Sequence, residues 1–170
     1  ISPLVAGYGN TMATALKRVM LTSIPGNAVM NVKIAGVKHQ FSTLKGMQED
    51  ILDFILNLKK VRIAGVTDEK PVTLTLTSKG EAEITAGDIK TSGNITIANP
   101  ELVLAHLSKG ATLDVELEVA QGVGYSSAED RPSGSIGVMP VDAIFTPVLR
   151  VNTKIEETRV GRVTNYDKLI

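Results

Sequence analysis

The stretch Leu113-Asp114-Val115-Glu116-Leu117-Glu118-Val119 alternates aliphatic residues with acidic ones. Successive side chains of a β-strand point to opposite faces of the sheet, so this period of two places every aliphatic residue on one face. Residues 72–77 repeat the alternation with threonine in place of the acids, and residues 30–34 alternate in a similar way. The sequence therefore predicts three strands with this period.

Two helices are predicted upstream of the acidic strand. Residues 11–23 are expected to form an amphipathic helix, because apolar residues recur there at spacings of three and four: Met12, Ala15, Leu16, Val19 and Met20. Pro25 should end this helix, with Gly26 in a left-handed cap. Residues 47–58 predict a second helix, opened by the acidic pair Glu49-Asp50. This helix has so little polar surface that the chain itself or a partner must bury it.

A short third helix is predicted over residues 100–108. Asn99-Pro100-Glu101 is typical of a helix start and Gly110 of a helix stop. Helices and strands then follow one another without a regular alternation, and no internal repeat is visible. The expected fold class is α+β.

The last third of the chain is expected to be mostly extended. Residues 122–137 predict a long surface loop rich in glycine and serine. Residues 136–151 and 153–160 predict strands, with breaks at Pro140 and Pro147.

Composition excludes several classes of protein. The chain has 170 residues, enough for one average domain or two small ones. Lys plus Arg and Asp plus Glu each number 18, so no global basic field exists to hold nucleic acid, and we expect only weak DNA binding. The absence of cysteine excludes thiol catalysis, disulfides and cysteine-based metal sites. No apolar run approaches the roughly 20 residues that a membrane helix needs. Both ends of the chain are abrupt, so we expect a fragment cut at both ends.

The sequence shows no self-sufficient active site. His39 and His106 lie on different predicted elements without a second metal ligand at a suitable spacing, so both are expected to be structural or surface residues. Residues 7–9 and 122–124 lack the third glycine of a dinucleotide-binding loop, and residues 133–137 are not a nucleophile elbow. Three acidic pairs are expected to be solvated or to open helices: Glu49-Asp50, Glu129-Asp130 and Glu156-Glu157. We therefore expect no catalytic residues, no metal and no cofactor.

The first predicted helix carries a basic end, Lys17-Arg18, beside Leu21 and Thr22. A guanidinium fork next to apolar contact area is typical of protein interfaces. A solvated basic helix turn is the alternative interpretation.

The stretch Gly7-Tyr8-Gly9-Asn10-Thr11-Met12-Ala13-Thr14-Ala15-Leu16-Lys17-Arg18-Val19-Met20-Leu21-Thr22-Ser23-Ile24-Pro25-Gly26 carries a resemblance to a known family. It resembles the pattern G-F-G-x-T-L-x-N-A-L-R-R-x-L-L-S-S-x-P-G of bacterial RNA polymerase alpha subunits, in their N-terminal assembly domain. Further similar stretches follow in the same order along the chain: residues 39–43, 48–52, 56–59, 122–125, 141–148, 157–161 and 167–169. Lys17 stands where the family has an arginine, and lysine lacks the planar fork of that residue.

The resemblance implies a two-part architecture. Residues 1–25 and 153–170 would form an incomplete dimerisation domain, and residues 26–152 an inserted α+β domain. The implied function is assembly in the cytoplasm: an alpha homodimer captures the beta subunit and then the beta-prime subunit, while the catalytic sites for DNA-directed transcription lie in those large chains. Neither a membrane nor direct DNA binding by this part of the subunit is implied.

The resemblance also assigns roles to individual residues. Large-subunit contacts would be made by Lys17, Arg18, Leu21, Lys59 and Asp142. We expect the homodimer contact on the face of the first helix that carries Met12, Ala15, Leu16 and Val19. A rival hypothesis is a stand-alone ligand-binding or enzyme domain on the same fold, which would need a pocket with convergent polar groups. An archaeal or eukaryotic counterpart subunit is a third possibility, although the similar stretches follow the bacterial pattern.

Overall fold

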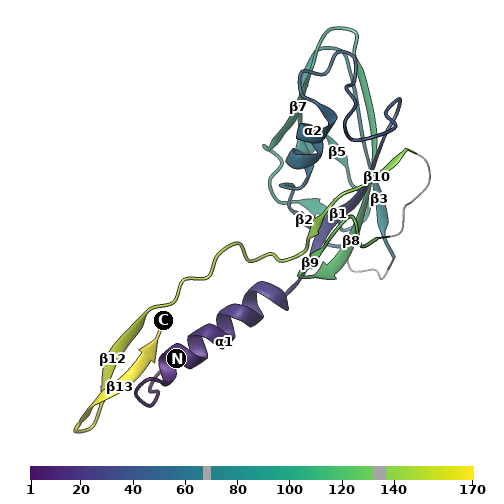
Figure 1. Ribbon diagram of the computed structural model, residues 1–170. Helices are drawn as coiled ribbons and strands as arrows, with labels where there is room; N and C mark the ends of the chain where they lie inside the picture. Colours follow the sequence, from purple (N-terminus) through teal and green to yellow (C-terminus); the bar gives the residue numbers. More distant parts are fainter. Residues whose placement is uncertain (67–69, 132–136) are drawn as a thin grey trace. The chain divides into compact units, whose positions relative to one another are not determined.

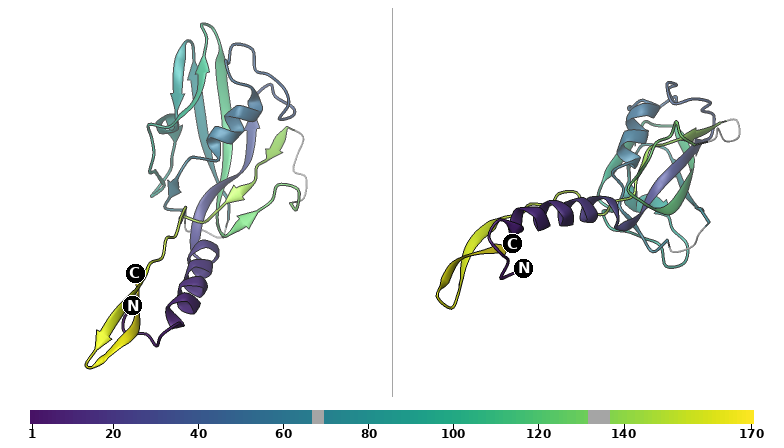
Figure 2. Two further views of the ribbon diagram at one scale, coloured as in Figure 1. Left: turned by 60° about the vertical axis from the view of Figure 1, so that its left-hand side comes forward. Right: turned by 60° about the horizontal axis from the view of Figure 1, so that its bottom comes forward.

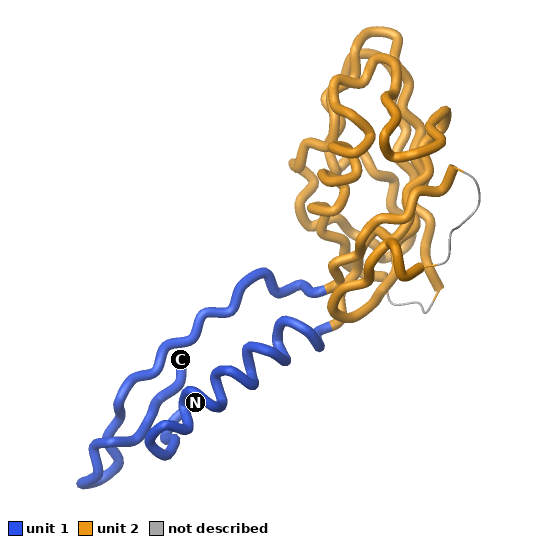
Figure 3. Tube along the Cα trace, in the orientation of Figure 1, with its two compact units in different colours: residues 1–24, 146–170 blue, residues 25–145 orange. Residues whose placement is uncertain are grey.

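The computed structural model describes residues 1–66, 70–131 and 137–170. The chain divides into two compact units, which Figure 3 distinguishes by colour. Unit 1 comprises residues 1–24 and 146–170, and unit 2 comprises residues 25–145. Each unit combines a helix with antiparallel strands, so the predicted α+β class is confirmed.

Unit 2 is built on an antiparallel sheet around the acidic strand (Figure 1). This strand, β8 (Thr112–Val123), lies between β1 (Pro25–Ile34) and β3 (Val72–Lys79). Leu117 is opposite Leu74 in one neighbour and Val32 in the other, and all three side chains are buried. The three strands predicted from period-two patterns are confirmed. The sheet also contains the short strands β2 (Ile63–Ala64), β5 (Ile89–Lys90), β6 (Thr96–Ile97) and β10 (Val138–Pro140).

The core of unit 2 forms where α2 (Ile51–Leu58) packs against one face of the sheet (Figure 2). Phe54 and Leu58 of this helix are fully buried in the same cluster as the inner residues of β8. The chain itself therefore buries one side of this apolar helix, as predicted, whereas Leu52 and Leu56 on its other side remain exposed. The unit also contains β4 (Ala82–Thr85), the 3-10 turn η1 (Ala86–Asp88), β9 (Tyr125–Ser126) and β11 (Ala143–Ile144).

The second helix begins at Ile51, four residues later than the predicted start at residue 47. Met47 instead forms an isolated β-bridge with Leu107, and the backbone N–H of Gln48 donates to the carbonyl of His106. Glu49 also turns away from the helix start and accepts hydrogen bonds from His106. Long-range pairing thus takes these residues out of the first turn.

The predicted third helix is wrong, because residues 103–107 form the strand β7 (Val103–Leu107), which pairs with β4. Asn99 does not cap a helix. Its Oδ1 accepts from the backbone N–H of Arg62 at 2.8 Å, and its amide donates to the carbonyl of Lys60 at 3.1 Å. A short apolar run fits a helix or a buried strand equally well, and pairing with β4 decides for the strand.

Unit 1 consists of a helix and a hairpin. The helix α1 (Tyr8–Thr22) confirms the first predicted helix, but it begins three residues before the predicted start at residue 11. The hairpin pairs β12 (Ile155–Val160) with β13 (Val163–Leu169). The expected left-handed cap at Gly26 is wrong. The helix ends at Ser23, whose N–H donates to the carbonyl of Val19, and Gly26 lies within β1. No helix in the described part of the chain is both long and apolar enough to cross a membrane.

The extended segments are shorter than the patterns predicted. Residues 122–123 belong to β8 and residues 125–126 to β9, so the predicted loop over 122–137 is partly strand. Residues 132–136, which include most of the rejected nucleophile elbow and the start of one predicted strand, lie outside the described residues. The strand predicted over 153–160 is present from Ile155.

Candidate functional site

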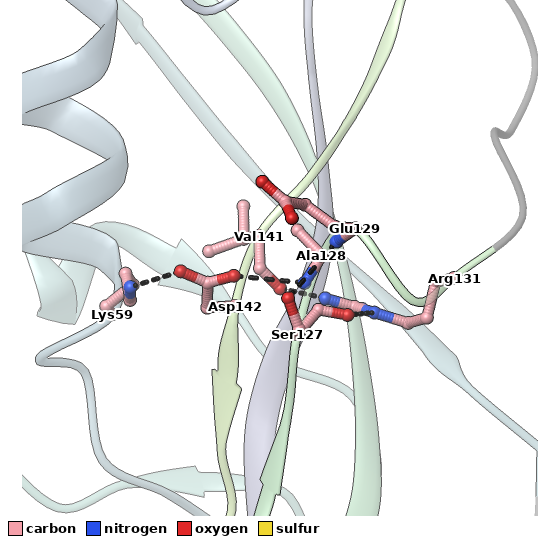
Figure 4. Close-up of polar contacts among 7 residues, drawn as sticks. All are labelled: Lys59, Ser127, Ala128, Glu129, Arg131, Val141 and Asp142. Atoms are coloured by element: carbon pink, nitrogen blue, oxygen red, sulfur yellow. Dashed lines mark hydrogen bonds and ion pairs between the residues drawn. The ribbon is translucent and has the colours of Figure 1, made fainter.

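Lys59 and Asp142 form an ion pair at the surface of unit 2 (Figure 4). Lys59 caps the C-terminal end of α2, and Asp142 lies between β10 and β11. The distance from Lys59 Nζ to Asp142 Oδ2 is 3.1 Å, and the two side chains are 23% and 35% exposed. The structure therefore joins two residues that the resemblance assigns separately to large-subunit contact.

The second carboxylate oxygen of Asp142 binds the loop after β9. Oδ1 accepts the backbone N–H of Ala128 at 3.0 Å. This hydrogen bond, followed by the contact with Lys59, lowers the pKa of Asp142 and outweighs the effect of desolvation. Asp142 is thus a fixed, ionised carboxylate at neutral pH.

Arg131 holds the same loop against the sheet, and sequence reasoning missed it. Its Nη1 donates to the carbonyl of Met30 at 2.9 Å, its Nη2 to that of Val141, and its Nε to that of Ser127 at 3.2 Å. The Met30 carbonyl lies at a register shift in β1, where the regular ladder with β8 is interrupted. Arg131 therefore fixes the backbone next to Asp142. Its position in a loop rich in glycine and serine gave no indication of this role.

The surface around the ion pair is hollowed and partly apolar. A cavity of about 220 Å³ is lined by Lys59 and Asp142 together with Leu52 and Leu56 of α2. A neighbouring cavity of about 450 Å³ contains Phe41, whose side chain is 76% exposed. Exposed apolar groups beside a fixed ion pair are typical of a protein-binding surface.

The other candidate residues lie on α1, in unit 1. At 3.6 residues per turn, Lys17, Arg18 and Leu21 lie on a side roughly opposite to the face that carries the second set, Met12, Ala15, Leu16 and Val19. Lys17 and Arg18 are exposed, and among the described residues neither forms an ion pair. The helix thus presents a basic side and an apolar side.

A second polar cluster joins the start of α2 to the β4–β7 pair. Nδ1 of His106 lies 2.6 Å from Oε1 of Glu49, whose Oε2 accepts the backbone N–H of His106 at 2.8 Å. Nε2 of His106 lies 3.9 Å from Oε2 of Glu83. Sequence reasoning saw no carboxylate near this histidine, because Glu49 precedes it by 57 residues. Within the described residues, no group of three or more His, Asp or Glu side chains is placed to hold a metal ion.

Residues 32–146 match the family described as the RNA polymerase Rpb3/RpoA insert domain. The chain belongs to this family. It is 51% identical to the DNA-directed RNA polymerase subunit alpha of Symbiobacterium thermophilum and 48% identical to that of Desulfitobacterium hafniense, in each case over 99% of the chain and 54% of the relative. The subunit alpha of Carboxydothermus hydrogenoformans is 47% identical over the same shares. The chain therefore spans about half the length of the curated relatives it matches, and the resemblance to bacterial alpha subunits is confirmed.

The insert domain thus contains both polar clusters, the Lys59–Asp142 pair and the His106 cluster. The first lies on a hollowed surface, whereas the second ties the segment before α2 to β7. The His106 cluster, called the His106 clamp below, therefore ties two segments of the insert domain together.

We expect the clamp to make the stability of the insert domain depend on pH. The hydrogen bond with Glu49 raises the pKa of His106 above its ordinary value of 6.5, against the effect of desolvation. Burial raises the pKa of Glu49, but its hydrogen bonds with His106 outweigh this and lower the pKa below 4.5. The His106 contribution is complete below pH 6.5 and is lost as the pH rises through the raised pKa; the Glu49 contribution is complete above pH 4.5 and is lost as the pH falls through the lowered pKa.

The measurement is the thermal unfolding midpoint, followed by circular dichroism, at about pH 6 and about pH 9. The natural chain should be less stable at the higher pH, and His106→Gln should reduce that difference. His39→Gln serves as the control, because the ring of His39 has no polar partner among the described residues. An unchanged difference in His106→Gln would mean that the clamp does not titrate in this range.

Proposed function

We propose that this chain is the N-terminal assembly part of a bacterial RNA polymerase alpha subunit. In this proposal it forms a homodimer and scaffolds the beta and beta-prime subunits for DNA-directed transcription in the cytoplasm. The observation that carries the proposal is the identity of 51% and 48%, over 99% of the chain, with proteins named DNA-directed RNA polymerase subunit alpha. No finding favours the alternative of a stand-alone ligand-binding or enzyme domain.

We further propose a division of labour between the two parts of the chain. Residues 1–25 and 153–170 would belong to the dimerisation domain, and residues 26–152 to the inserted domain. The apolar side of α1, on which Ala15, Leu16 and Val19 are exposed and Met12 is half-buried, supports a homodimer contact. The basic side of α1 and the Lys59–Asp142 pair would contact the large subunits. Lys17 and Arg18 form no ion pair among the described residues, and the Lys59–Asp142 pair is fixed beside the apolar side chains of Leu52 and Leu56.

The proposed subunit is non-catalytic and uses no cofactor. Its contribution to nucleotidyl transfer would be to hold the large subunits, which carry the chemistry, and it would bind DNA only weakly because its formal net charge is zero. The test is RNA synthesis on a DNA template. The purified subunit alone should produce no RNA, and mixing it with the beta and beta-prime subunits should give activity. RNA synthesis by the subunit alone would contradict the proposal.

Asp142→Ala tests the proposed large-subunit contact in the insert domain. The substitution removes the partner of Lys59 and the acceptor of the Ala128 N–H. In the proposed interface the Asp142 carboxylate would accept a hydrogen bond from the beta subunit. Hydrogen bonds to charged groups contribute about 1.5–3 kcal/mol, so losing this one should weaken capture of the beta subunit by the full-length protein at least about tenfold.

The matched control is Glu116→Ala, which breaks the exposed Lys33–Glu116 ion pair on the same unit. An exposed pair contributes under about 1 kcal/mol, so this variant should bind the beta subunit as the natural chain does. Binding curves from a labelled beta subunit compare the two. Equal affinities for Asp142→Ala and Glu116→Ala would remove Asp142 from the interface.

A further inference from the structure

The helix α1 has no N-terminal cap of its own. The capping position is Gly7, which has no side chain and a left-handed φ of 83°, and the first turn contains no acidic residue. The first four N–H groups of a helix have no partner within the helix, and its N-terminus carries partial positive charge. The N–H of Tyr8 donates locally, to the carbonyl of Val5 at 2.9 Å, which leaves the N–H groups of Gly7 and Gly9 for an acceptor elsewhere.

Asp167 of β13 supplies the missing cap. Its Oδ2 accepts the backbone N–H of Gly7 at 2.9 Å and that of Gly9 at 3.0 Å, across 160 and 158 residues of sequence. A carboxylate placed at the positive end of a helix forms stronger hydrogen bonds than a neutral acceptor does. This one oxygen thus joins the start of α1 to the hairpin.

The backbone of Asp167 binds the segment that leads into the helix. Its N–H donates to the carbonyl of Leu4 at 2.8 Å, and its carbonyl accepts the N–H of Leu4 at 2.9 Å. Asp167 therefore forms four hydrogen bonds with residues 4–9, two through its side chain and two through its backbone. The main-chain pairing of β13 with β12 holds Asp167 in register, opposite Glu157.

The approach of α1 to the hairpin requires a glycine at position 9. A Cβ atom there would lie 2.9 Å from Asp167 Oδ2 and 3.2 Å from Cγ2 of Ile155. Ala13, one turn further along, is the other buried residue of the helix. The two buried residues of α1 thus lie in its first two turns, and Asp167 provides the polar part of the contact there.

We propose that Asp167 is a positioning residue for subunit assembly: by capping α1 from the hairpin, it sets the direction in which the helix presents its basic and apolar sides. This inference rests on the proposed assembly function for its consequence, but the cap itself is independent of that function. The carboxylate does not touch a partner in this proposal. It acts through α1, which makes the contact with the partner.

The experiment compares three variants of the full-length subunit. Asp167→Ala removes the acceptor, Asp167→Asn keeps an acceptor oxygen without the charge, and Glu157→Ala removes a carboxylate from the same hairpin without touching α1. Hydrogen–deuterium exchange, read by mass spectrometry on peptides covering residues 5–12, reports the cap. Capture of the labelled beta subunit reports assembly.

We expect exchange in this peptide to become about fivefold faster in Asp167→Ala, the usual consequence of losing a helix cap, with beta-subunit capture reduced to a similar extent. Asp167→Asn should recover part of both properties, since a neutral acceptor forms a weaker cap, and Glu157→Ala should match the natural subunit. If Asp167→Ala does not fold, the comparison of Asp167→Asn with Glu157→Ala decides, since only the former should exchange faster than the natural chain.

If hydrogen–deuterium exchange over residues 5–12 is unchanged in the Asp167 variants, Asp167 does not cap α1. Faster exchange with unchanged capture would overturn its role in positioning. If the natural subunit itself captures no beta subunit, the proposed function fails and the assembly role fails with it, while the exchange rates still decide whether Asp167 caps the helix.

Discussion

Arg18→Ala in the full-length subunit should weaken capture of the beta subunit by about 2 kcal/mol or more, about 30-fold, and leave folding nearly intact. Arg18 is exposed on α1, and its side chain forms no ion pair among the described residues, so the fold gains little from it. Its guanidinium can bind a carboxylate or carbonyl pair of a partner while its stem lies along the helix. The interface would therefore lose a strong contact that the isolated subunit does not use.

The measurement is the affinity of the labelled beta subunit for each alpha variant, with circular dichroism as the test of folding. Lys90→Ala is the control, because Lys90 is an exposed cation on β5 of the insert domain and has no proposed contact. If Arg18→Ala unfolds the subunit, Arg18 is structural. If it binds the beta subunit normally, Arg18 is a solvated bystander.

Val19→Glu should disrupt the homodimer by at least about 100-fold. Val19 is 55% exposed and shares one side of α1 with Leu16 and Ala15, so a carboxylate there would be tolerated by the folded monomer. In the proposed dimer the same position becomes buried, and an unpaired buried charge costs several kcal/mol. Dimerisation should therefore fail while the helix persists.

Sedimentation over a range of subunit concentrations measures this effect. Thr14→Glu introduces the same charge on the other side of α1, where Thr14 is exposed, and should leave the dimer unchanged. A tight dimer of Val19→Glu at nanomolar concentration would show that the subunit pairs through another surface.

Local patterns predicted the elements whose burial follows their own sequence. Residues 113–119 and 72–77 alternate because one face of each strand enters the core, and the period-two signal needs no knowledge of the partner strand. The helix α1 was predicted from its apolar spacing, although Leu16, Val19 and Met20 of that stripe are exposed in unit 1. The short run at residues 103–107 carries no such period, so its pairing with β4 could not be predicted and a helix was expected instead.

The polar contacts depend on residues that are far apart in the chain. Lys59 and Asp142 are separated by 83 residues, and Asp167 and Gly7 by 160. The resemblance assigned Lys59 and Asp142 to one role, but nothing in the sequence indicated that they form an ion pair. The cap from Asp167 was missed altogether, because a helix cap is expected next to the helix and Gly7 offers no acceptor there.

The assembly role is tested most directly by isolating the tagged full-length protein from its host and quantifying what accompanies it by mass spectrometry. The proposal predicts that the beta and beta-prime subunits of RNA polymerase are recovered in constant proportion to it, and that Arg18→Ala lowers that proportion. Recovery of the protein without either large subunit would contradict the proposal.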